Sequence, residues 1–171
     1  MEAYFDNSAT TIVTDSVKDI VVKTMTEDFG NPSAMHMVGV KAEKYIKEAQ
    51  ENIAKILKVD PKEIFFTSGG TESNNMAIIG TAMANKRKGN KIITTSVEHS
   101  SVLATMKYLE EQGFEVIYLP VDRYGVVQME ALEKEMTEDT ILVSTMYVNN
   151  EVGAIEPVGE IGQYIKKVNP S

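Results

Sequence analysis

The stretch KEIFFTSGGTESNNMAI, from Lys62 to Ile78, combines three local signals. A short apolar run at 64–66 predicts a β-strand, Gly69 and Gly70 predict a tight turn, and the residues from Thr71 onward have the spacing of an amphipathic helix. The first N–H groups of a helix lack partners within it and lie at the positive end of its dipole, and glycine lets the backbone approach a ligand closely. The segment therefore predicts an anion site to which Thr71 adds a hydroxyl, although such a turn can also serve capping alone.

Two familiar nucleotide motifs are absent from this stretch. A dinucleotide fingerprint requires three glycines spaced G-x-G-x-x-G, and a P-loop requires a Lys followed by Ser or Thr. Here the glycine turn is followed by Thr71, Glu72 and Ser73, without a Lys. The expected anion is therefore not a nucleotide polyphosphate.

Composition restricts the class of protein without naming a function. The chain has 171 residues, of which 43% are hydrophobic, so it can bury a core and form one domain. Its net charge of −8 argues against a nucleic-acid partner or an acidic membrane surface. There is no Cys, and His36 and His99 are the only histidines, so neither a disulfide nor a metal site is expected. No signal peptide or membrane-spanning run is apparent, and a cytoplasmic location is expected.

Helical and strand patterns alternate along the chain, which predicts an α/β fold with a mostly parallel sheet covered by helices. The expected helices lie near 17–29, 42–57, 72–86, 100–112 and 129–136, and the expected strands lie at 64–67, 91–95, 115–119 and 140–144. In such sheets, ligands bind beyond the carboxyl ends of the strands.

Two polar candidates follow expected strands directly. His99 comes after KIITT and precedes a helix, where its ring could stack on a flat cofactor, exchange protons near neutral pH or simply cap the helix. Asn150 follows ILVSTMYV and offers both a donor and an acceptor to a planar ligand, but the segment Asn149–Glu151 could equally be a turn.

Six segments together resemble the N-terminal part of cysteine desulfurases, which are pyridoxal-phosphate enzymes of the class V aminotransferase group. These segments are YFDNSATT, FGNPSAMHMVG, FTSGGTESNN, SVEHSSVL, GFEVIYLPVDRYG and DTILVSTMYVNNEVGAIEPV, and they extend from Tyr4 to about Val158. The resemblance implies the N-terminal portion of the large domain of a fold-type I PLP-dependent transferase. Residues 1–35 would be an N-terminal segment and helix, and residues 36–171 an incomplete large domain.

The resemblance also implies roles for individual residues. Gly70 and Thr71 would hold the phosphate of pyridoxal 5'-phosphate. His99 would stack on the pyridine ring and move protons, and Asn150 would hydrogen-bond the phenolic oxygen. The segments 7–9 and 31–33 would shape the substrate mouth or a dimer contact, and His36 would be structural.

The family's chemistry also needs a Schiff-base Lys, an Asp at the pyridine nitrogen and a nucleophilic Cys. None of the Lys residues has the family's Ser-x-His-Lys setting, and Cys is missing. We therefore expect this chain to be inactive alone and to bind the cofactor non-covalently at most. It could be one half of a split desulfurase acting on L-cysteine with a C-terminal half polypeptide, a fragment of a longer enzyme, or a non-catalytic assembly subunit. A selenocysteine lyase fragment is a further alternative. A homo- or hetero-oligomer and a sulfur-acceptor scaffold protein are the other expected partners.

Overall fold

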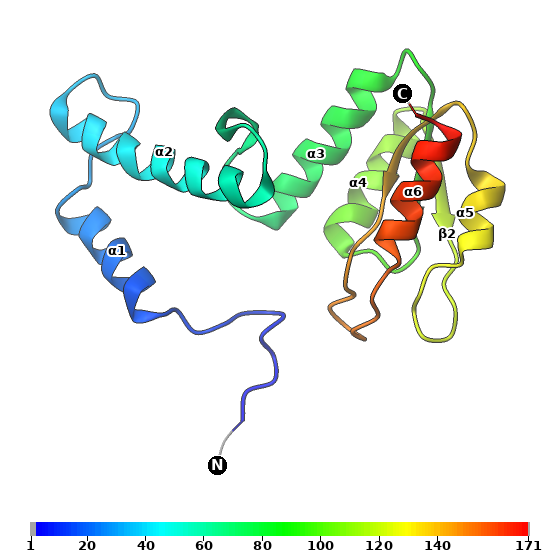
Figure 1. Cartoon of the computed structure of the whole chain (residues 1–171), viewed down its shortest axis with the longest axis horizontal. Helices are drawn as coiled ribbons and strands as arrows, with labels where there is room; N and C mark the ends of the chain where they lie inside the picture. The colour runs from blue at the N-terminus through cyan, green and yellow to red at the C-terminus, as the bar shows by residue number, and fades with distance from the viewer. Residues whose placement is uncertain (1–2, 171) are drawn as a thin grey trace. The chain divides into compact units, whose positions relative to one another are not determined.

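The computed structural model describes residues 3–170, which form two compact units. The first unit ends at Phe66, and the second begins at Thr67. Figure 1 shows the helices of both units and the sheet region of the second. The division expected between residues 35 and 36 does not coincide with this boundary and stays a prediction.

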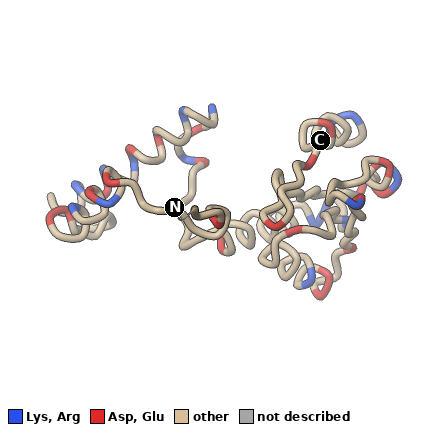
Figure 2. The backbone as a smooth tube through the Cα atoms, turned by 90° about the horizontal axis from the view of Figure 1, so that it is seen from below, with Lys and Arg blue, Asp and Glu red and all other residues tan. Residues whose placement is uncertain are grey.

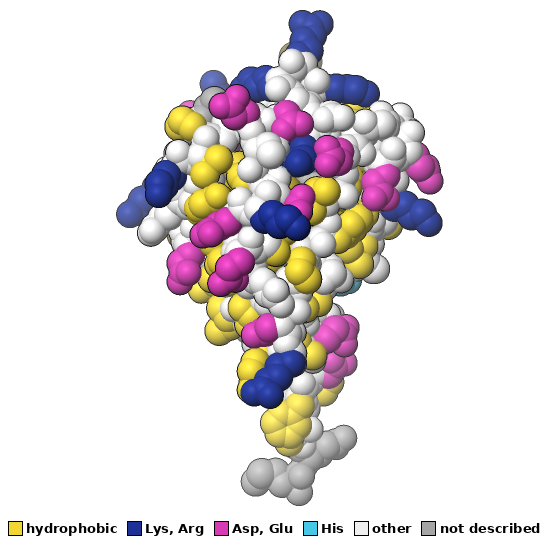
Figure 3. Space-filling view, turned by 90° about the vertical axis from the view of Figure 1, so that its right-hand side faces the viewer, with side chains coloured by type: hydrophobic (Ala, Val, Ile, Leu, Met, Phe, Trp, Pro, Cys, Tyr) yellow, Lys and Arg dark blue, Asp and Glu magenta, His cyan; other side chains and the backbone are white. Residues whose placement is uncertain are grey.

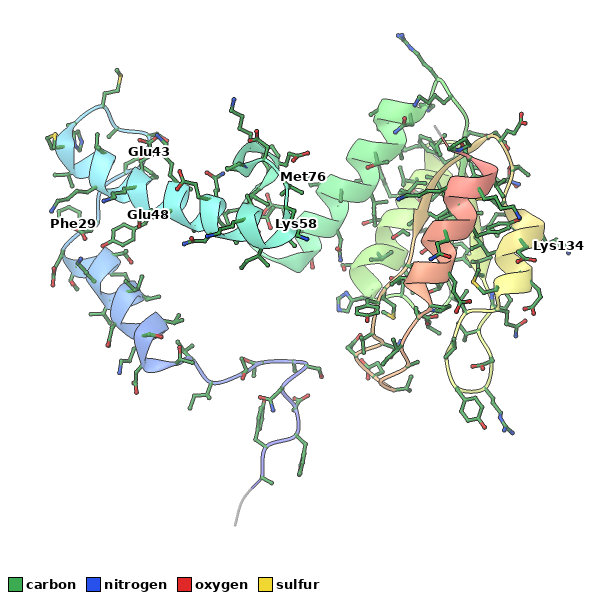
Figure 4. The ribbon with its side chains drawn as sticks, in the orientation of Figure 1. Phe29, Glu43, Glu48, Lys58, Met76 and Lys134 are labelled. Atoms are coloured by element: carbon green, nitrogen blue, oxygen red, sulfur yellow. The ribbon has the colours of Figure 1, made fainter. Side chains whose placement is uncertain are left out.

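The first unit is helical. It contains α1, α2 and a short 3-10 helix, η1, at Asp15–Thr26, Met37–Leu57 and Pro61–Glu63. Helix α2 begins before the expected Ala42 because His36 caps it: Nδ1 of His36 accepts a hydrogen bond from the N–H of Gly39 at 3.2 Å. The helix ends before Lys58, whose φ of 58° is the left-handed conformation that commonly terminates helices (Figure 4).

A carboxylate after α1 connects the two long helices of this unit. The hydroxyl of Tyr45 on α2 donates to Oδ2 of Asp28 at 2.7 Å, and the ammonium groups of Lys23 and Lys41 lie 3.5 and 3.6 Å from its oxygens. The bond from Tyr45, and then the two positive charges, hold the pKa of Asp28 below its ordinary value against the opposing effect of desolvation.

The second unit is built on a three-stranded parallel sheet. Its strands β1, β2 and β3 are Lys91–Thr95, Glu115–Leu119 and Thr140–Ser144, in the order β2-β1-β3. All three strands were expected at these residues. Helices α3, α4, α5 and α6 are Gly70–Asn85, Ser100–Glu111, Met129–Glu135 and Val158–Val168, of which α6 was not expected.

The expected strand at 64–67 is wrong. These residues have no strand conformation, and Phe65 and Phe66 are 72% and 54% exposed. A strand needs a neighbour that pairs with its N–H and C=O groups, and the described residues provide no such neighbour here. An apolar run without a pairing partner remains irregular.

Helices cover both faces of the sheet, and consecutive residues of β1 mark the two sides. Ile92 packs in a core with α3 and α4, whereas Ile93 packs in a second core with α5 and α6. Figure 1 shows these pairs of helices in green and in yellow to red. The alternation follows from the two-residue period of a strand, and it confirms the expected helix-covered sheet.

Charged side chains of both signs are distributed along the chain. Figure 2 shows Lys and Arg interspersed with Asp and Glu in both units, and Figure 3 shows both signs among apolar side chains on the face that it presents. Among the described residues, no helix combines the length and apolar character needed to cross a bilayer.

Candidate functional site

The glycine turn before α3 is held by its own hydroxyl groups. The hydroxyl of Thr67 donates to the carbonyl of Gly69 at 3.0 Å and lies 2.6 Å from Oγ of Ser73. On the other side, the carboxylate of Glu72 accepts from both N–H and Oγ of Ser68, each at 2.6 Å. These bonds to Ser68 lower the pKa of Glu72, the hydroxyl contributing most.

Three backbone donors at the start of α3 remain available. Among residues 3–170, no group accepts from the N–H groups of Gly70, Thr71 or Glu72, whereas Ser73 N–H already donates to Gly69 at 3.1 Å. A Cβ added at Gly69 or Gly70 would meet no atom within 4 Å, so packing within the chain does not require glycine there. Free N–H groups with open space beside them fit a phosphate group.

His99 lies in the loop after β1, where it is the N-cap of α4. Its exposed ring accepts a hydrogen bond from the N–H of Ser101 at 3.1 Å through Nδ1, and Oγ of Ser101 lies 2.8 Å from the same nitrogen. The capping alternative is therefore realised in the structure. Stacking of the ring on a cofactor is compatible with this geometry and stays a prediction, since only Nδ1 is engaged.

Two side-chain hydrogen bonds join the beginnings of α3 and α4. Nδ2 of Asn74 donates to Oγ of Ser101 at 2.9 Å, and Oγ1 of Thr105 donates to Oδ1 of Asn75 at 3.0 Å. Both bonds lie within the first two turns of the two helices. The turn that holds Gly70 and Thr71 and the cap at His99 are thereby brought to the same edge of the second unit.

Asn150 lies in the loop that follows β3, and its side chain is exposed. Its Nδ2 donates to Oε1 of Glu151 at 3.1 Å. The preceding Asn149 is 6% exposed and shapes this loop: its Oδ1 accepts from the N–H groups of Glu151 and Val152, at 2.8 and 3.0 Å. Nδ2 of Asn149 donates to the carbonyl of Val97 in the loop that leads to His99, at 3.1 Å. The loops carrying Asn150 and His99 are thus connected.

Sequence reasoning missed the supporting roles of Asn149 and Glu98. Glu98 is 7% exposed, and its Oε1 accepts from Oγ1 of Thr95 at 3.0 Å and from the N–H of Met146 at 2.7 Å. Burial raises the pKa of this carboxyl, and the charge of Glu156 adds to the effect. The sequence shows Glu98 only as an acidic residue directly before His99 at the end of a strand. A solvent-exposed acidic side chain is ordinary at such a position, so nothing in the sequence indicated burial.

A metal centre was not expected, and within residues 3–170 no group of three or more His, Cys, Asp or Glu side chains has the arrangement of one. The donors at this edge are backbone N–H groups, an imidazole and an amide, which suit an organic anion with a planar ring.

Comparison with known families identifies the chain. The sequence profile described as "Aminotransferase class-V" matches residues 3–170. The chain belongs to the class-V aminotransferase family. The expected fold class, the N-terminal portion of the large domain of a fold-type I transferase, agrees with this membership and is confirmed by the structural likeness.

Relatives within the family carry the name that the sequence resemblance suggested. The chain is 48% identical over 168 residues to "Cysteine desulfurase IscS" of Clostridium botulinum. The aligned region covers 98% of this chain and 42% of that protein. It resembles a solved "NIFS-LIKE PROTEIN" with a TM-score of 0.94 and 48% identity, over 99% of this chain and 47% of the other. It also resembles a structure named "SspA in complex with cysteine", with a TM-score of 0.88 and 38% identity, over 96% and 47%. The chain therefore spans less than half the length of the relatives that it matches.

Proposed function

We propose that this chain is the N-terminal, cofactor-binding part of a cysteine desulfurase that depends on pyridoxal 5'-phosphate. The complete enzyme transfers sulfur from L-cysteine to a thiol, leaving L-alanine and a persulfide that supplies iron-sulfur clusters or thio-cofactors. The observation that carries the proposal is that the N–H groups of Gly70, Thr71 and Glu72 have no acceptor within residues 3–170. They begin the helix that Asn74 ties to the cap at His99.

The site residues have separate roles in this proposal. Gly70 and Thr71 bind the phosphate through backbone N–H groups and a hydroxyl. His99 stacks on the pyridine ring and moves protons, while Asn150 hydrogen-bonds the phenolic oxygen. When bound, pyridoxal 5'-phosphate supplies the electron sink that makes cleavage of the C–S bond of cysteine accessible.

The same proposal holds that the chain is inactive alone. It contains no Cys to accept sulfur, and it matches 42% of the Clostridium botulinum relative. The Schiff-base Lys, the Asp at the pyridine nitrogen and the nucleophilic Cys belong to the C-terminal part of the enzyme, supplied by a second polypeptide or by a longer form of this chain. The completed enzyme is cytoplasmic, acts as a homo- or hetero-oligomer and passes sulfur to an acceptor scaffold protein.

Two surfaces support association with a complementary polypeptide. Strand β3 is an edge of the described sheet, and a hollow of about 100 Å³ beside it is lined by residues that include Leu142, Val143 and Ile165. An unpaired strand edge is a template for strand addition. In the first unit, Val17, Ile20 and Met25 of α1 are 52%, 50% and 72% exposed, and such apolar surface is typical of an interface.

Phosphate binding at the turn before α3 can be tested on the chain itself. Pyridoxine 5'-phosphate is the appropriate probe because it lacks the aldehyde that would react with any surface lysine. In a titration followed by amide NMR, we expect saturable shifts at Gly70, Thr71 and Glu72, together with shifts around His99. Pyridoxine without its phosphate should produce none of them. Equal shifts with both compounds, or no shift at the turn, would contradict the proposal.

A complementation experiment tests whether the residues for the covalent chemistry lie outside this chain. The region of the Clostridium botulinum relative that this chain does not match would be purified and mixed with this chain, pyridoxal 5'-phosphate and L-cysteine. We expect sulfide release in the presence of a reductant only when both polypeptides are present. Sulfide release by this chain alone would show that the assignment of the covalent chemistry is wrong.

A further inference from the structure

The hydrogen bonds around His99 determine which ring nitrogen carries the proton. Nδ1 lies 3.1 Å from the backbone nitrogen of Ser101, which can only donate. Nδ1 must therefore be the acceptor, and the neutral ring carries its proton on Nε2. The exposed side of the ring, away from α4, is then a hydrogen-bond donor.

The hydroxyl of Ser101 and the amide of Asn74 extend this arrangement. Oγ of Ser101 is 2.8 Å from Nδ1 of His99 and 2.9 Å from Nδ2 of Asn74. An amide NH₂ can only donate, so Ser101 accepts from Asn74 and donates its own proton to the ring. Ser101 is 8% exposed, which protects these bonds from competition by water. Hydrogen bonds therefore run in one direction, from Asn74 through Ser101 to His99.

We propose that Asn74 and Ser101 are positioning residues that hold the imidazole of His99 in its Nε2-protonated tautomer and in a fixed direction. The functional meaning of this role rests on the proposed function, in which His99 faces the cofactor. Because Asn74 lies on α3, the helix that begins at the phosphate turn, a displacement of that helix would be transmitted to the ring. Capping of α4 does not need the hydrogen bonds that run from Asn74 through the hydroxyl of Ser101, since the backbone bond from Ser101 N–H satisfies the cap.

The tautomer can be measured directly by long-range ¹H–¹⁵N NMR on the chain labelled at histidine, without any ligand. The chain has two histidines, and the signals lost in His99→Gln belong to His99. At a pH where the ring is neutral, we expect the wild-type ring to be almost entirely the Nε2–H form. In Ser101→Ala, the Nδ1–H form should increase by roughly five-fold, as expected for the loss of one ordinary hydrogen bond.

Asn74→Asp provides a second, nearly isosteric test. A carboxylate at this position would accept the hydroxyl proton of Ser101 and withdraw it from the ring, so the same increase is expected as in Ser101→Ala. The double variant should show no larger increase in the Nδ1–H form than either single variant, because both changes remove the same hydrogen bond, from the hydroxyl of Ser101 to the ring. Ser101→Thr keeps a hydroxyl at this position and should retain the wild-type tautomer ratio.

Ser100→Ala is the matched control, because Ser100 is the exposed neighbour in the same helical turn. It should leave the tautomer ratio unchanged. The proposal is overturned if Ser101→Ala and Asn74→Asp keep the wild-type ratio while their amide spectra show an intact fold. It is also overturned if the wild-type ring is mainly the Nδ1–H form. Neither result depends on pyridoxine 5'-phosphate binding, so failure here and failure of the proposed function are distinguishable.

Discussion

The side-chain amide of Asn149 donates to the main-chain carbonyl of Val97 at 3.1 Å, and so connects the loop after β3 to the loop after β1. These two loops carry Asn150 and His99, which the sequence identifies as candidate site residues. Asn149 itself is buried, whereas Asn150 is exposed. In this pair of adjacent asparagines, the first holds the loop, and the second is exposed and donates to its neighbour Glu151.

Replacing Asn149 with Ala should destabilise the second unit. The change leaves the N–H groups of Glu151 and Val152 and the carbonyl of Val97 without their partner, and each loss of this kind typically costs about 1–3 kcal/mol. In the variant, water can reach part of the loop and replace some of the lost hydrogen bonds. We therefore expect a decrease of roughly 2–3 kcal/mol in the free energy of unfolding, measured by urea titration. Asn150→Ala is the control and should change it by less than about 0.5 kcal/mol. Similar losses in both variants would show that Asn149 has no special structural role.

Gly70→Ala should separate ligand binding from folding. Since a Cβ at Gly70 meets no atom within 4 Å, stability should stay the same or rise by up to about 1 kcal/mol, because Ala favours helix over Gly. Binding of pyridoxine 5'-phosphate should nevertheless weaken, because the methyl group would occupy the space beside the free N–H groups. The matched control is Gly159→Ala in the first turn of α6, where an added Cβ also meets nothing. If both variants bind the probe as the wild type does, the turn is not the phosphate site.

Glu98→Gln should change how stability depends on pH. Burial raises the folded-state pKa of Glu98 above its unfolded value, so its contribution is fully present below the unfolded pKa and is lost as pH rises through the folded pKa. Glutamine keeps an oxygen that can accept from Thr95 and Met146 but has no charge to bury. Relative to wild type, the variant should therefore gain stability progressively as pH rises above about 4.5.

Urea titrations between pH 5 and 8 would measure this difference for Glu98→Gln. Glu133→Gln, at an exposed position of α5, is the control and should show no comparable trend. A stability difference that stays constant over this range would argue against a raised pKa for Glu98.

Tyr45→Phe should raise the pKa of Asp28 in the first unit. The hydrogen bond from Tyr45 is the largest cause of the lowered pKa. Removing the hydroxyl leaves the charges of Lys23 and Lys41 and the hydrogen bond from Lys23 to oppose desolvation. A lowered folded-state pKa gives stability that is present above the unfolded pKa and is lost as pH falls through the folded pKa. The variant should thus lose this stability at a higher pH than the wild type does. Carboxyl ¹³C NMR titration measures the shift directly, and an unchanged pKa would mean that the charges of Lys23 and Lys41 dominate.

The sheet was largely predictable from local sequence. Strand β1 is buried along its whole length, and β2 and β3 share its β-branched, apolar character, so their boundaries could be read from composition. The run at 64–67 has the same character but no strand to pair with, a condition that composition does not reveal. Helix α6 was missed although Ile161, Ile165 and Val168 have helical spacing, because Gly159 and Gly162 weaken its helix propensity.

The candidate site was predictable only in part. Gly70, Thr71, His99 and Asn150 were found because each follows an expected strand or turn, and the roles assigned to them from family resemblance stay predictions. Glu98 and Asn149 could not be found in this way. Their partners Met146 and Val97 lie 48 and 52 residues away, and such hydrogen bonds leave no local pattern in the sequence.

Helices α3 and α4 begin at the same edge of a chain whose net charge is −8. In the proposed function, a phosphorylated compound is repelled at long range by the acidic chain and attracted only within the last few ångströms by the N–H groups at the start of α3. At physiological ionic strength the repulsion is screened beyond about 8 Å, whereas the short-range attraction is not. Added salt should therefore accelerate capture of the compound, the opposite of the slowing observed when a basic protein attracts an anion from a distance.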